Sequence, residues 1–139
     1  MNDIARCSCG AVSVSVSAEP YAVVACHCSD CRRRTGAPFG VGVYFDRAQV
    51  SISGATGCFE RPAAEGRKVR NYFCTTCGGP VYWRTDLHPD GVGVALGMFD
   101  EPERYTPTRS VFERHRSTWC RLDASIPGHL EGRNSPPSR

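Results

Sequence analysis

Two short stretches, Cys7-Ser8-Cys9-Gly10 and Cys74-Thr75-Thr76-Cys77-Gly78, decide how this chain folds. Each has the spacing of a zinc knuckle and supplies two thiols, and a structural zinc site takes four ligands. The glycine after each second cysteine permits the left-handed backbone conformation that a knuckle often requires. The sequence therefore predicts one zinc site that ties the N-terminal end of the chain to its middle. Its predicted ligands are Cys7, Cys9, Cys74 and Cys77.

A third cluster, Cys26-His27-Cys28-Ser29-Asp30-Cys31, lies between the two knuckles and supplies three thiols. Three protein ligands and an open fourth position are typical of catalytic zinc, so Cys26, Cys28 and Cys31 predict a second, reactive zinc. The alternative is a site closed by a fourth protein ligand, and the candidates are His27, Asp30, Cys58 and Cys120. His27 lies between two ligands and would point away from the metal, so we expect it beside the site or at the surface. Both clusters together predict two zinc ions per chain.

Disulfide bonds are the rival interpretation of the nine cysteines. An odd number leaves one cysteine unpaired, and Cys-x-Cys pairs are too close along the chain to bridge easily. Residues 1–10 also lack the charged start and apolar run of a secretory signal. We therefore expect a reducing, cytoplasmic setting, which suits free thiolates and zinc.

Length and composition predict a single domain. The 139 residues are 40% apolar, which is enough for one core, and no stretch approaches the roughly 20 apolar residues of a membrane span. We therefore expect no membrane partner. A pI of 8.4 lies below the value of about 9 that is typical of nucleic-acid modules, so nucleic acid is not the expected partner either. We place the zinc domain at residues 1–130. Residues 131–139 contain two adjacent prolines and no large apolar side chain, which predicts a disordered tail.

Alternating apolar and polar residues predict a mainly β fold. In residues 11–17, valines occupy one face of an extended segment and serines occupy the other. The other predicted strands are 21–25, 39–45, 50–53, 68–73, 81–85 and 92–98. Helical periodicity is poor, and we expect only short helical turns at 30–34 and 100–104.

Gly40 and Gly42 share one face of the predicted strand 39–45. Glycine weakens a strand unless another group must approach the backbone closely. This face therefore predicts either a ligand cleft or a tight bend.

Three arginines, Arg32, Arg33 and Arg34, follow the second cluster directly. A cationic run would offset the negative charge of three thiolates on zinc, and guanidinium groups hold carboxylates well. We take Arg32 and Arg33 as candidate substrate-binding residues. The alternative is a solvated turn.

The cysteine motifs resemble those of a known family. The segments 7–12, 26–32 and 73–78, with Thr35-Gly36, are similar to the glutathione-dependent formaldehyde-activating enzyme and centromere protein V family, and the match extends to Trp119. The resemblance implies a β-tent-like domain of antiparallel sheets stapled by zinc on the two ligand sets given above. Many members carry a histidine before a Phe-Val-Glu-like segment, where this chain has Arg109-Ser110-Val111-Phe112-Glu113.

The resemblance also implies an activity. In the family's named enzyme, glutathione and formaldehyde condense to S-hydroxymethylglutathione, which is carbon-sulfur lyase chemistry. We therefore expect a zinc-dependent lyase that acts on an adduct of a small thiol, such as glutathione, and an aldehyde. One alternative is a non-catalytic zinc module that binds a protein or a nucleic acid. The other is a thiol or metal sensor, which requires Cys58 or Cys120 close to the second cluster.

Overall fold

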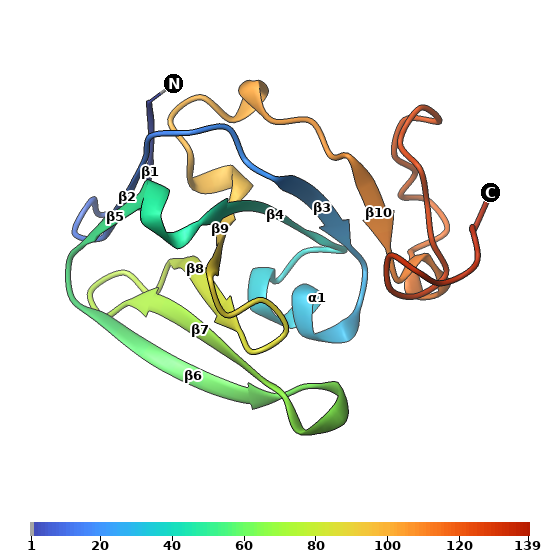
Figure 1. Cartoon of the computed structure of the whole chain (residues 1–139), viewed down its shortest axis with the longest axis horizontal. Helices are drawn as coiled ribbons and strands as arrows, with labels where there is room; N and C mark the ends of the chain where they lie inside the picture. Colours follow the sequence, from blue (N-terminus) through green and yellow to red (C-terminus); the bar gives the residue numbers. More distant parts are fainter. Residues whose placement is uncertain (1) are drawn as a thin grey trace.

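The computed structural model describes residues 2–139, which form two β-sheets (Figure 1). The smaller sheet is antiparallel and has the strand order β1-β2-β5, with β1 at Asp3–Arg6, β2 at Ser13–Val16 and β5 at Val50–Ser53. The larger sheet has the order β10-β3-β4-β9-β8-β7-β6. Its strands are β3 (Ala22–Cys26), β4 (Gly40–Asp46), β6 (Thr56–Pro62), β7 (Lys68–Cys74), β8 (Pro80–Thr85), β9 (Gly91–Ala95) and β10 (Arg109–Val111).

Helical structure is limited to short segments, but there are more of them than the two that were predicted. The helix α1 spans Ser29–Thr35, and the 3-10 turns are η1 (Arg47–Gln49), η2 (Ala64–Gly66), η3 (Leu96–Met98), η4 (Pro102–Arg104) and η5 (Glu113–His115). Turn η3 replaces the end of the predicted strand 92–98. Within residues 2–139, no helix has the length and apolar character needed to cross a membrane.

Three strands have too weak a pattern to be predicted. Strand β1 is four residues long, β10 is three, and β6 is an edge strand whose side chains are mostly exposed. None of them shows the apolar alternation that marked the other strands. The pairing of β10 with β3 is parallel, which differs from the antiparallel sheets that we expected.

The two sheets share one core. Val14 and Val16 of β2 are buried against residues of the larger sheet such as Val43, Phe45 and Val94. The valine face predicted for residues 11–17 is therefore the core face. The fold is mainly β, and it brings cysteines from distant parts of the chain together.

Composition predicts a disordered tail at 131–139, whereas the structure places this segment against the domain, beyond β10 (Figure 1). Pro137 forms a bridge with His129, Ser138 N donates to Gly128 O at 3.0 Å, and Arg139 Nη2 donates to Ile126 O at 2.6 Å. These contacts are polar and involve the backbone, so a search for large apolar side chains does not detect them.

Candidate metal centres

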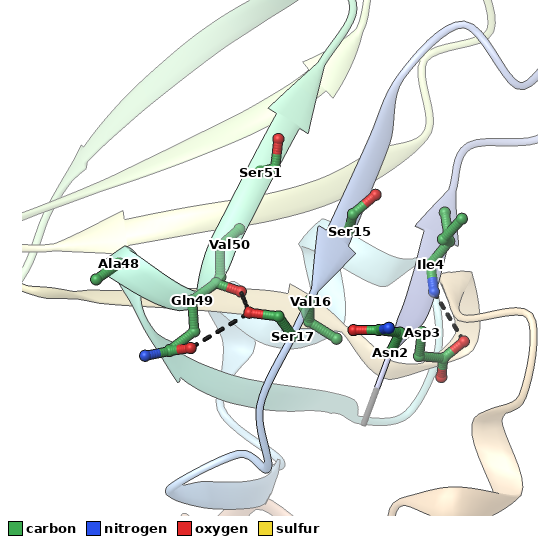
Figure 2. A pocket seen from close by; sticks show the side chains of 10 residues that line it. All are labelled: Asn2, Asp3, Ile4, Ser15, Val16, Ser17, Ala48, Gln49, Val50 and Ser51. Atoms are coloured by element: carbon green, nitrogen blue, oxygen red, sulfur yellow. Dashed lines mark hydrogen bonds between the residues drawn. The ribbon is translucent and has the colours of Figure 1, made fainter.

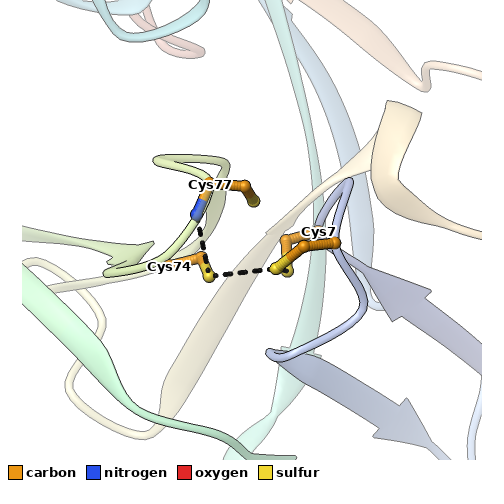
Figure 3. A group of neighbouring side chains, drawn as sticks. Cys7, Cys74 and Cys77 are labelled. Carbon is orange, nitrogen blue, oxygen red and sulfur yellow. Dashed lines mark hydrogen bonds between the residues drawn. The ribbon is translucent and has the colours of Figure 1, made fainter.

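The first centre joins the β1–β2 loop to the β7–β8 turn. The Sγ atoms of its four predicted ligands all lie within 4.8 Å of one another, and Figure 3 shows Cys7, Cys74 and Cys77 converging. Cys9 Sγ is 3.6 Å from the Sγ atoms of both Cys7 and Cys74. A tetrahedron with Zn–S bonds of about 2.3 Å has S–S edges of about 3.8 Å, so the four thiols fit a zinc ion.

Backbone geometry supports this centre as predicted. Gly10 and Gly78 have φ angles of 79° and 77°, which lie in the left-handed region. The turns aim amide groups at sulfur: Val12 N is 3.3 Å from Cys7 Sγ, and Thr76 N is 3.3 Å from Cys74 Sγ. Backbone N–H donors, those of Cys77 and Thr76 above all, lower the pKa of Cys74. The thiolate that a metal requires is thereby stabilised.

The second centre lies where β3 meets α1. Cys26 ends β3, Cys28 caps the N-terminus of α1, and Cys31 lies in the first turn of the helix. Their Sγ atoms lie within 4.8 Å of one another, and within residues 2–139 no other cysteine, histidine or carboxylate completes the group. Neither Cys58 nor Cys120 is a member. The donor set fits a metal with an open position, and the two cysteines that a thiol sensor required do not belong to it.

Cys28 is the hydrogen-bond acceptor within the second centre. Hydrogen bonds from the thiols of Cys26 and Cys31 lower the pKa of Cys28 to about 2, and Cys31 N–H adds a contact of 3.4 Å. The interaction with Cys28 in turn raises the pKa of Cys26. A metal cation in the centre would replace the shared protons and favour all three thiolates.

His27 is not a member of the second centre, as predicted, but it is fully buried and not at the surface. Its Nε2 is 3.0 Å from Ser110 Oγ and 3.9 Å from Glu113 Oε2. Glu113 Oε1 accepts from Ser138 Oγ at 2.5 Å, and Arg139 Nη2 is 3.7 Å from Oε2. The segment 109–113 therefore packs against the residue that lies between Cys26 and Cys28.

The arginines after the cluster have different positions. Arg32 and Arg33 are exposed on α1, and their role in substrate binding stays a prediction. Arg34 is half-buried, and its Cζ lies 4.1 Å from the centroid of the Trp83 ring. Sequence reasoning did not assign Arg34 and Trp83 to the site, because helix position and strand pairing bring them together.

Trp83 and Arg34 occupy the glycine face of the larger sheet. A Cβ atom at Gly42 would lie 2.6 Å from Trp83 Cζ2, and one at Gly93 would overlap Trp83 Nε1. At Gly40, a Cβ atom would lie 2.6 Å from Arg34 Nη2. The close approach that the glycines of β4 indicated is therefore made by two side chains of the protein itself.

A separate hollow lies over the smaller sheet (Figure 2). It is lined by residues of β1, β2, β5 and their neighbours, and Ser17 Oγ donates to Gln49 Oε1 there at 3.2 Å. No cysteine lines it. The hollow therefore offers no thiol chemistry.

Comparison with known proteins agrees with this geometry. The family model described as glutathione-dependent formaldehyde-activating enzyme matches residues 3–115, which is more than half of the chain and includes both centres. A crystal structure of a Rhodobacter sphaeroides protein is similar in fold, with a TM-score of 0.57 and 22% identity over 70% of this chain and 87% of that one. A search of curated proteins found no significant match. The chain belongs to the glutathione-dependent formaldehyde-activating enzyme family.

Proposed function

We propose that the protein is a zinc-dependent carbon-sulfur lyase that acts on the adduct of a small thiol and an aldehyde. The observation that carries this proposal is the second centre, in which Cys26, Cys28 and Cys31 converge without a fourth protein ligand among residues 2–139. The family match supports glutathione and formaldehyde as the reactants. We further propose that zinc fills both centres and that the protein works in the cytoplasm.

In the proposed reaction, the sulfur of a thiol attacks the carbonyl carbon of the aldehyde and an S–C bond forms. The C=O π electrons move to oxygen, and the proton of the thiol ends on that oxygen to give an S-hydroxymethyl adduct. When bound, zinc would lower the pKa of a substrate thiol that coordinates it.

The chain's own residues would hold and shape this reaction site. Cys26, Cys28 and Cys31 would hold the metal, and the N-terminal amides of α1 stabilise the sulfur of Cys28. Buried His27 closes the side of the Cys26–Cys28 segment that faces Ser110 and excludes water from it.

Exchange between free formaldehyde and the adduct tests the proposal. With ¹³C-formaldehyde and glutathione, NMR exchange spectroscopy measures the rate of adduct formation above the uncatalysed reaction. The wild-type protein should accelerate exchange and Cys28→Ser should abolish the acceleration, because the variant lacks one of three ligands. Cys58→Ser, which changes an exposed cysteine outside both centres, is the matched control. Equal rates with wild-type and Cys28→Ser protein would reject the lyase.

A further inference from the structure

Arg34 is a half-buried arginine without a carboxylate partner. Within residues 2–139, no side-chain hydrogen bond or ion pair involves its guanidinium, and its contact is the face of Trp83 at 4.1 Å. Two other partly buried arginines are paired: Arg61 lies 3.3 Å from Asp30, and Arg70 lies 3.0 Å from Asp86. Stacking uses the face of a guanidinium and leaves its in-plane N–H groups free to donate.

The sheet beneath the guanidinium fixes its position. The absence of side chains at Gly42 and Gly93 lets the Trp83 indole lie on the backbone, and Gly40 leaves the room that Arg34 Nη2 occupies. Trp83 Nε1 also donates to Tyr44 Oη at 3.3 Å, which holds the indole in place. A guanidinium that is already oriented loses less entropy when it binds an anion.

The stacked guanidinium lies beside the second centre. Arg34 is three residues after Cys31 in α1, so the two side chains share one face of the helix. The register of the sheet gives the same proximity: Gly40, whose missing side chain leaves room for Arg34 Nη2, is the β4 partner of Cys26. A carboxylate on Arg34 would therefore be held beside the thiol cluster.

We propose that Arg34, stacked on Trp83, is the anion-binding residue of the second centre and selects thiols or thiol adducts that carry a carboxylate. This inference rests on the proposed function and names its substrate class. It assigns to Arg34 the role that the sequence suggested for Arg32 and Arg33, which point into solvent. A bidentate guanidinium-carboxylate contact gives both orientation and affinity.

Binding of S-methylglutathione tests this proposal without turnover. The ligand keeps both carboxylates of glutathione but has no free thiol to coordinate a metal, and its diethyl ester has no carboxylate. The chain has two tryptophans, so Trp119→Phe protein, purified whole with zinc, leaves Trp83 as the one fluorescent tryptophan. Trp119 is 74% exposed, which makes this background mild.

We expect S-methylglutathione to change the fluorescence of Trp83 and to bind about tenfold or more tightly than its diester. Arg34→Gln should reduce the affinity for the acid to that for the diester. Arg34→Lys should retain part of the affinity difference between the acid and the diester, because lysine keeps the charge but lacks the planar guanidinium. Arg121→Gln, which removes an exposed charge with no ion pair within residues 2–139, should bind like the parent protein.

Equal affinity for the acid and the diester would overturn the inference, and this comparison on the parent protein needs no Arg34 variant to fold. A loss of affinity in Arg32→Gln or Arg33→Gln, with none in Arg34→Gln, would also overturn it. Glutathione-formaldehyde exchange that is catalysed but insensitive to Arg34→Gln would leave the lyase and reject the role of Arg34. Selective binding of the acid without catalysed exchange would support the role of Arg34 and reject the lyase.

Discussion

The cysteines of the two centres have separate roles. Cys28 accepts hydrogen bonds from two thiols and from the first turn of α1, so its sulfur organises the second centre. The first centre shares no residue with it. Each centre should therefore respond to substitution on its own.

Cys28→Ser should remove the metal of the second centre and leave that of the first. We expect two zinc ions per wild-type chain and one per variant chain, measured by native mass spectrometry on protein purified without added metal. Free thiols counted in parallel should rise by those of Cys26 and Cys31. One zinc in both proteins would show that the second centre does not retain metal.

Gly93→Ala should destabilise the fold by about 1–3 kcal/mol, because the added Cβ would overlap the Trp83 indole. Urea unfolding followed by circular dichroism measures the loss. Gly97→Ala is the matched control, since a Cβ there meets no atom within 4 Å and should leave the stability nearly unchanged. Equal stability of the two variants would mean that Trp83 does not lie on the sheet as described.

At the scale of elements, the C-terminal segment supports the turn after β10. Phe112 adopts a left-handed φ of 55°, which is strained for a large side chain, and its N–H donates to Glu131 O at 2.8 Å. Burial alone would raise the pKa of Glu113, but hydrogen bonds from Ser138 and Ser110 and the charge of Arg139 hold it below its ordinary value. The segment thus helps to keep a buried carboxylate ionised beside His27.

Deletion of residues 131–139 should destabilise the protein by about 1–3 kcal/mol at neutral pH, because Glu113 loses its C-terminal partners. Thermal or urea unfolding measures this. Since the pKa of Glu113 is lowered by folding, its stabilising contribution is present at neutral pH and is lost as the pH falls through the folded value. The difference between full-length and truncated protein should shrink over that range. A dispensable tail would give equal stabilities at every pH.

At the scale of the whole molecule, the first centre joins the loop of the smaller sheet to the edge region of the larger one. The two sheets share a core of valines and a few aromatic residues, and the first centre adds a second link between them. A structural zinc contributes on the order of 10 kcal/mol in small domains, which exceeds the stability of many of them.

Cys74→Ser should therefore give misfolded, insoluble protein, because it removes a buried cysteine of this centre. The yield of soluble protein and the cooperativity of melting measure the effect. Cys58→Ser, at an exposed cysteine outside the centre, should stay soluble. Cys74→Ser protein that melts cooperatively with unchanged zinc content would contradict a structural role.

The sequence by itself predicted which cysteines form the two groups that the structure brings together, because the spacing within each motif is a local property of the chain. It also determined the strands with clear alternation, because period-2 burial is local. The shared face of Gly40 and Gly42 was also visible in the sequence, where it predicted either a ligand cleft or a tight bend. Only the tertiary structure decided what approaches it, since Trp83 comes from β8 and Arg34 from α1. The structure also decided that no fourth protein ligand among residues 2–139 joins the second centre. The parallel pairing of β10 and the packing of the C-terminal segment depend on long-range contacts. These contacts are polar or involve the backbone, so no apolar pattern in the sequence predicts them.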